Sequence, residues 1–173
     1  RPSNFAIMDQ IEALRWIQAN IASAGGDPTN ITIMGESAGG NNVIYLMASP
    51  LTKDLFSRAI IQSSGWALLE NQEAEKYVNA YKKIMKQLSH IENADQYLRA
   101  LSWEEILKLI SPIYEELGYQ AVIDQHSLTE PVAQTLSSSD YRKIDVLIGS
   151  NADEWKMSLS EKDGLEEYVL NSL

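Results

Sequence analysis

One serine in this sequence sits in a context typical of a reactive hydroxyl. Residues 35–39 read Gly-Glu-Ser-Ala-Gly and fit the pattern G-x-S-x-G. A short apolar run precedes the pattern and a stretch with helical character follows it, which is the context that gives the motif chemical meaning. A turn this sharp strains the backbone at Ser37, and glycines let neighbouring segments approach closely. We predict a Ser37 hydroxyl held at the carboxyl end of a sheet, with the Ala38 N–H as an oxyanion donor. The simpler alternative is a plain turn around a small residue.

The flanking sequence predicts the elements that must hold this turn. Residues 5–23 carry apolar side chains at helical spacing, and the glycines at 25–26 end that helix. The runs at 31–34, 59–62 and 146–149 are short, apolar and rich in β-branched residues, so they predict three buried strands. Strands that alternate with helices favour an α/β fold with a parallel sheet, and fully apolar strands favour a sheet covered on both faces.

A block between the second and third predicted strands differs in composition. Residues 70–120 are rich in Glu, Lys, Leu and Tyr, and predict about three amphipathic helices, for example at 73–88 and 103–110. The block is either a cap-like insertion or packing alone, and the pattern leaves both open. The polar tail from Ser160 is also predicted to be helical.

Composition excludes several functional classes. The chain has 173 residues, with 24 acidic and 14 basic side chains and a formal charge of −10, so it would be repelled by nucleic acid and by anionic membranes. No apolar run approaches the roughly 20 residues that span a bilayer. The chain has no cysteine, which excludes disulfides, thiol catalysis and cysteine metal sites and suits a reducing compartment. We therefore expect a cytoplasmic protein without excluding secretion, and we discount a sequon at Asn30 because three-residue matches are common.

Several separate motifs, in order, resemble one family. These are NFAIMDQ, ALRWIQANI, GGDP, ITIMGESAGG, FSRAIIQSSG and VLIGSNADEW. Together they resemble the type-B carboxylesterases, which include cholinesterases and para-nitrobenzyl esterases. The resemblance covers residues 4–157 and is weakest in the helical block. It implies a partial α/β-hydrolase fold over residues 1–173, with a nucleophile half at 1–69, a cap-like insertion at 70–120 and an acid-bearing part at 121–173.

The resemblance also implies roles for individual residues. Ser37 matches the nucleophile that forms an acyl-enzyme, and Ala38 matches an oxyanion donor. Glu154 matches the acid that orients a catalytic histidine, and its neighbour Asp153 is the competing candidate. The reaction runs on side chains, so no metal or organic cofactor is expected. The substrate is expected to be a small-molecule carboxylic ester, and the alcohol and acyl groups stay undetermined.

Two further residues match the family pattern near the sharp turn at Ser37, the nucleophile elbow. Ser63 matches a serine close to the acid, although a hydroxyl that caps a strand end is an equal alternative. Glu36 matches a residue that we interpret as structural support for the turn. The sequence departs from the family pattern without loss of a functional group at four positions, Ala6, Ala24, Ser64 and Trp155.

Two parts of the expected machinery have no match in the sequence. The order in this fold is serine, acid, histidine, and no histidine follows Glu154. His90 and His126 precede the acid and are poor candidates for the base. The glycine-rich loop that completes the oxyanion hole would precede Arg1. We therefore expect an internal piece of a larger esterase that is inactive by itself, with an unpaired sheet edge at 31–34 through which copies could associate.

Two other classes of protein remain as alternatives. One is a cholinesterase-like binding or adhesion domain that has lost catalysis, against which the presence of both Ser37 and Glu154 argues. The other is a thioesterase or acyltransferase, in which the same elbow occurs. The GGDP and ADEW segments argue against that reading.

Overall fold

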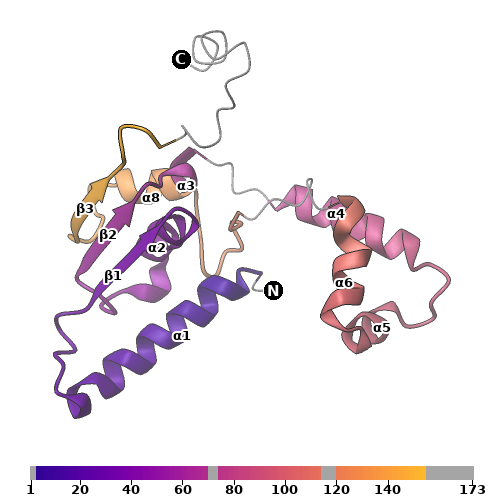
Figure 1. Ribbon diagram of the computed structural model, residues 1–173, viewed down its shortest axis with the longest axis horizontal. Helices are drawn as coiled ribbons and strands as arrows, with labels where there is room; N and C mark the ends of the chain where they lie inside the picture. The colour runs from indigo at the N-terminus through magenta and orange to yellow at the C-terminus, as the bar shows by residue number, and fades with distance from the viewer. Residues whose placement is uncertain (1–2, 70–73, 114–119, 155–173) are drawn as a thin grey trace, which may run out of the picture.

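The computed structural model describes residues 3–69, 74–113 and 120–154, and its arrangement is drawn in Figure 1. Three strands form one parallel sheet in the order β1-β2-β3. They are β1 (Thr32–Glu36), β2 (Arg58–Gln62) and β3 (Asp145–Gly149). The predicted strands are therefore confirmed within one or two residues at each end. Because the strands are parallel, their carboxyl ends lie at one edge of the sheet.

The helices fall into two groups along the chain. Those that belong with the sheet are α1 (Phe5–Asn20), η1 (Ile21–Ala24), α2 (Ala38–Ala48), η2 (Pro50–Thr52), α3 (Trp66–Leu69) and α8 (Val132–Ser137). Those between β2 and β3 that lie apart from it are α4 (Glu75–Gln87), α5 (Ala94–Ala100), α6 (Trp103–Ile110) and η3 (Ser111–Ile113). The sequence did not predict α8, because six residues after a proline are too few to establish a helical period.

The core lies between α2 and one face of the sheet. Ile33 of β1 and Ala59 and Ile61 of β2 point to this face and are buried. Helix α2 packs on β1 and β2, and seven of its residues are buried. Helix α1 adds Ile11, which has no exposed surface, and ends through η1 at Gly25, whose φ of 85° suits glycine.

The opposite face of the sheet is open in the part of the chain that the structure describes. Ile60 of β2 is paired with Met34 of β1 and Leu147 of β3, and the three side chains form one row across this face. Met34 and Leu147 are 65% and 66% exposed. The expectation of a sheet covered on both faces is therefore wrong for the described residues. Apolar strand residues favour burial, but the strand composition does not show which segment of a protein packs against each face of the sheet.

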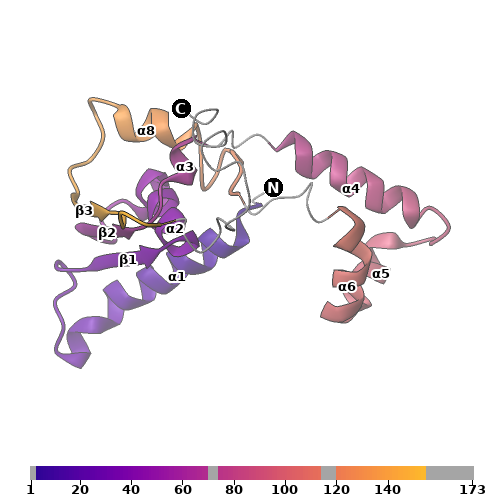
Figure 2. The same ribbon diagram turned by 45° about the horizontal axis from the view of Figure 1, so that its top comes forward.

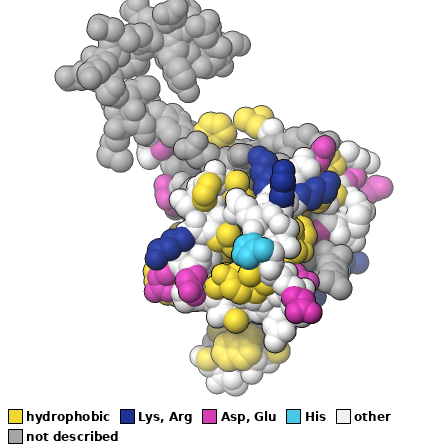
Figure 3. Space-filling model, turned by 90° about the vertical axis from the view of Figure 1, so that its right-hand side faces the viewer, with side chains coloured by type: hydrophobic (Ala, Val, Ile, Leu, Met, Phe, Trp, Pro, Cys, Tyr) yellow, Lys and Arg dark blue, Asp and Glu magenta, His cyan; other side chains and the backbone are white. Residues whose placement is uncertain are grey.

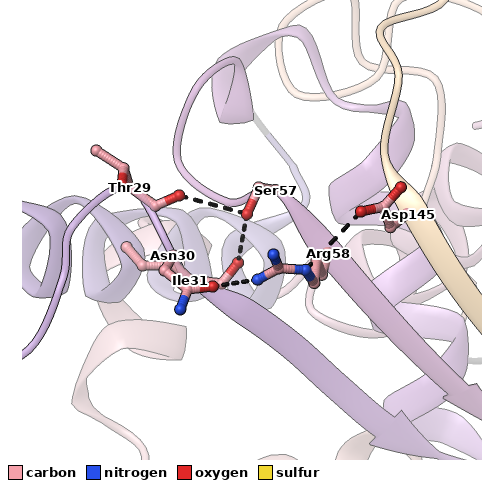
Figure 4. A network of polar contacts seen from close by, with 6 residues as sticks. All are labelled: Thr29, Asn30, Ile31, Ser57, Arg58 and Asp145. Carbon is pink, nitrogen blue, oxygen red and sulfur yellow. Dashed lines mark hydrogen bonds and ion pairs between the residues drawn. The ribbon is translucent and has the colours of Figure 1, made fainter.

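Polar contacts join the three strands at their amino ends, opposite the predicted site. Arg58 donates a hydrogen bond to the Asn30 side chain and lies 3.8 Å from the Asp145 carboxylate (Figure 4). In the same view the Ser57 hydroxyl faces the carbonyl oxygens of Thr29 and Ile31 at 3.5 and 3.4 Å. These contacts fix the strand register at the edge that carries no predicted function.

Residues close to the N-terminus are bound to a distant loop. The Asn4 side chain donates to the Val122 carbonyl and the Ser127 hydroxyl, both at 2.7 Å, and accepts from the Val122 N–H at 2.9 Å. Asp124 accepts from the N–H groups of Ser127 and Leu128 at 2.7 and 3.1 Å. Its pKa is about 2: burial, the largest single influence, raises it, but four backbone N–H donors together outweigh burial.

The helical block stands beside the sheet rather than on it. Figures 1 and 2 both show α4, α5 and α6 grouped together away from the strands. The Tyr77 hydroxyl of α4 donates to the Gln120 carbonyl at 2.8 Å, which connects the block to the rest of the chain. The face in Figure 3 carries hydrophobic side chains between charged ones. No helix within the described ranges is both long and apolar enough to cross a membrane.

Candidate active site

Ser37 occupies a strained turn between a strand and a helix. It follows the last residue of β1, precedes the first residue of α2, and has φ 53° and ψ −120°. Its N–H donates to the Gln62 carbonyl at 2.9 Å, and its carbonyl accepts from the Asn41 N–H at 3.1 Å. A non-glycine residue in such a conformation costs about 1–3 kcal/mol, which the surrounding contacts must supply. The predicted strand–turn–helix is present, and the serine is exposed.

Close packing around the elbow depends on glycine at two positions. A Cβ at Gly35 would lie 2.3 Å from the carbonyl carbon and oxygen of Gly39, and a Cβ at Gly40 would lie 2.6 Å from the Cβ of Ser64. A Cβ at Gly39 would meet nothing within 4 Å. Of the two motif glycines that we predicted to allow close packing, only Gly35 must therefore lack a side chain. At Gly39 it is the backbone that is contacted.

Ala38 begins a helix of 11 residues, so its N–H lies at the positive end of the helix dipole. It is exposed and lines a cavity of about 560 Å³ that is shared with Phe5, Asn41, Asn42 and Trp66. An anion formed on a group bound to Ser37 would meet this helix terminus. The geometry is therefore compatible with the oxyanion role predicted for Ala38, which stays a prediction.

Ser63 and Glu154 lie in loops at the same edge of the sheet. Ser63 follows β2 and Glu154 belongs to the loop after β3, and the Ser63 N–H donates to the Gly149 carbonyl at 2.8 Å. The pKa of Glu154 is lowered from its usual value, first by the Ser63 side chain and then by the Asn151 N–H, which donates to the carboxylate at 2.8 Å. An ionised carboxylate is the form that the acid of a triad requires. Asp153, the competing candidate, is exposed.

Glu36 lies on the open face of the sheet at the end of β1 and is exposed. With Gln62 and Ser63 it lines a second cavity of about 430 Å³ at the carboxyl edge. Its predicted role in support of the elbow stays a prediction. No group of three or more acidic or histidine side chains suited to a metal ion occurs within residues 3–69, 74–113 and 120–154.

The two histidines lie away from the elbow in the chain. His90 follows α4. His126 is exposed in the loop around Asp124, and its backbone N–H donates to the Asp124 carboxylate at 3.0 Å. Neither lines either of the two cavities beside Ser37 and Ser63. Sequence reasoning also missed Asn41, whose side chain contacts the loop after β2. The unusual pair of asparagines after the motif glycines is the only signal that could have drawn attention to it.

Comparison with known proteins identifies the family. A model described as the carboxylesterase family matches residues 1–169. Carboxylesterase 1C of Mus musculus is 32% identical over 98% of this chain and 32% of its own length, and para-nitrobenzyl esterase of Bacillus subtilis is 31% identical over 87% and 32%. The crystal structure of carboxylesterase EST55 of Geobacillus stearothermophilus superposes with a TM-score of 0.76 at 32% identity, over 95% of this chain and 37% of that one.

These relatives bear out the expected fold as well as the resemblance. Their structures have the α/β-hydrolase fold, of which the parallel sheet with flanking helices described above is a part. This chain spans about a third of the length of the relatives that it matches. The matched motifs, the elbow and the sheet lead to one conclusion: the chain belongs to the carboxylesterase family.

Proposed function

We propose that this chain carries the nucleophile and the acid of a serine-type carboxylic ester hydrolase. The observation that supports the proposal most is the strained Ser37 at the start of α2, at the sheet edge where Glu154 also lies and accepts from the Asn151 N–H. In this mechanism the Ser37 Oγ attacks the ester carbonyl carbon and gives its proton to a base. The negative oxygen of the tetrahedral intermediate faces the Ala38 N–H. The carbon–oxygen bond to the alcohol breaks, the alcohol takes the proton, and water then hydrolyses the acyl-enzyme.

The base in this proposal is a histidine from outside the 173 residues. No histidine follows Glu154, and neither His90 nor His126 lines the cavities at the elbow. A serine without its base is a weak nucleophile, and the loss of one triad member typically costs several orders of magnitude in rate. The chain by itself is therefore expected to be nearly inactive. The substrate class that the family membership supports is a small-molecule carboxylic ester.

Labelling with a fluorophosphonate, followed by intact mass spectrometry, tests the proposal. We expect slow labelling of the folded chain at Ser37, acceleration by added imidazole, and no labelling of Ser37→Ala. Ser23→Ala, which changes an exposed serine in η1, serves as the matched control and should label like the wild type. Equal labelling of wild type and Ser37→Ala in imidazole would contradict the nucleophile role. Fast labelling without imidazole would contradict the external base.

A binding domain that has lost catalysis is the alternative that the sequence leaves open. The same labelling experiment separates the two, because a domain that only binds gains no Ser37 reactivity from imidazole.

We also propose that copies of this chain associate through the edge of β1. In the described part of the chain β1 has β2 on one side only, so its other side presents N–H and C=O groups for pairing. We expect a dimer or larger species in size-exclusion chromatography with light scattering. A monodisperse monomer across a range of concentrations would contradict this proposal.

A further inference from the structure

Helix α6 of the helical block presents an apolar stripe to solvent. Trp103 and Leu107 lie one turn apart and are 69% and 46% exposed, and Ile106 beside them is also exposed. None of the eight residues of α6 is buried, and within the described ranges the only element with extensive contacts to α6 is η3, which directly continues it. Apolar residues three and four positions apart share one face of a helix, and such a face usually packs against another element.

Two opposite charges flank this stripe in a fixed order. Glu104 lies in the first turn of α6 and Lys108 in its last turn, on the same side of the helix. Both are exposed, and neither belongs to an ion pair within residues 3–69, 74–113 and 120–154. Glu105 differs, because its carboxylate is used in the capping box with Ser102. Glu104 and Lys108 therefore suit a partner that presents a base and an acid in the reverse order.

A second copy of α6, turned to run antiparallel, presents that reverse order. An antiparallel pair lays the first turn of one helix beside the last turn of the other, so Trp103 packs near Leu107 of the second copy and Glu104 faces Lys108 of the second copy. A two-fold axis through the middle of the pair repeats each contact once. A parallel pair would instead bring identical residues level with one another. The charge pattern of α6 is thus complementary to itself in one orientation only.

We propose that two copies of this chain associate through their α6 helices, packed antiparallel about a two-fold axis. Trp103 and Leu107 form the apolar contact, and Glu104 and Lys108 form two reciprocal ion pairs. Eight residues from each copy bury less than the about 800 Å² per partner of a standard interface, so the dimer is weak and depends on concentration. The contact is separate from the edge of β1, because α6 lies away from the strands, and it does not depend on catalysis at Ser37.

Charge reversal, read by sedimentation velocity over a range of concentrations, tests the proposal in the intact chain. Glu104→Lys and Lys108→Glu should each weaken dimerisation about tenfold, because each places like charges opposite one another twice in the dimer. The double variant Glu104→Lys/Lys108→Glu should restore it. Leu107→Gln should weaken dimerisation as well, whereas Val78→Gln, at a similarly exposed position of α4, is the matched control and should leave it unchanged. Circular dichroism checks that each variant keeps its helix content.

Cross-linking with a carbodiimide locates the contact, because this reagent joins a carboxylate to an adjacent amine with loss of water. In a mixture of isotope-labelled and unlabelled chain, only a link between copies joins a labelled peptide to an unlabelled one. We expect such a link from Glu104 to Lys108 in the wild type, and its loss in Lys108→Arg, which should still dimerise.

Three results would overturn the proposal. The first is a double variant that stays as weak as the single reversals. The second is association without a link between copies from Glu104 to Lys108, which would leave the edge of β1 as the contact. The third is a loss of association in Leu107→Gln with no effect of either charge reversal, which would mean that the stripe packs on another surface, such as the open face of the sheet. Fluorophosphonate labelling does not enter these measurements, so this proposal and the proposed function can fail separately.

Discussion

The sheet body and the helical block are built on different sources of stability. The sheet body contains one continuous buried cluster that includes Ile11, Ile44 and Val132, each almost completely removed from solvent. No residue of α4, α5 or α6 belongs to that cluster, and α6 has no buried residue. The block instead shows local helix signals such as the capping box of Ser102 and Glu105. The elbow belongs to the region with the core, because a strained turn needs surroundings that cannot relax.

The largest expected effect comes from a core deletion. Ile11→Ala should reduce the free energy of unfolding of the sheet body by about 2–5 kcal/mol, because it removes a fully buried side chain and leaves a cavity. Ile106→Ala in α6, where the side chain is 37% exposed, should cost less than about 1 kcal/mol. Urea denaturation of both variants measures the difference. Equal losses would show that the two regions share one core.

The elbow offers a sharper comparison within the sheet body. Gly35→Ala should cost about 3 kcal/mol, because its Cβ would overlap the Gly39 backbone, which cannot move without distortion of α2. Gly39→Ala places its Cβ in open space within a helix and should be neutral or gain up to about 1 kcal/mol. Thermal unfolding of the two variants shows whether each substitution lowers or raises the stability. A stable Gly35→Ala would mean that the close approach is not required.

A substitution at Asp124 tests the hydrogen-bonded contact between the N-terminal segment and the loop at 121–128. Its folded pKa of about 2 lies below its ordinary value of 3.8, so its contribution is complete above about pH 4 and is lost as the pH falls toward 2. Asp124→Asn should cost about 1 kcal/mol near pH 6, a value reduced for the solvent that reaches the group. Urea denaturation from pH 6 to 2.5 should show that the difference in free energy of unfolding between Asp124→Asn and the wild type becomes smaller as the pH falls. A constant difference would contradict the charge-based role.

The last prediction concerns a local effect in the helical block. Ser102→Ala removes the N-cap of α6, where the Ser102 hydroxyl accepts from the Glu105 N–H at 3.3 Å, and should cost about 1 kcal/mol. Because α6 has no buried residue, the loss should stay local, with faster amide hydrogen exchange in α6 and unchanged exchange in β2. Faster exchange in both elements would mean that the block and the sheet unfold together.

The sequence by itself determined the local elements and the turn at Ser37. The β-branched runs became β1, β2 and β3, and the helical periods became α1, α2, α4 and α6, because strand and helix patterns are local properties of neighbouring residues. The motif around Ser37 located the strained turn, and its first glycine, Gly35, answers a local steric demand, because a Cβ there would overlap the Gly39 backbone. The matched motifs also predicted which family the chain belongs to.

Only the tertiary structure decided which distant residues meet. Asn4 contacts Val122 across 118 positions, and Asn41 contacts Ser64 across 23, and no local period encodes such pairs. The bond from the Ser63 N–H to the Gly149 carbonyl follows from the parallel register that brings the ends of β2 and β3 to one edge. The apolar composition of the strands likewise did not predict that one face of the sheet is open. Composition states that a side chain favours burial, whereas the packing of other segments decides whether it is buried.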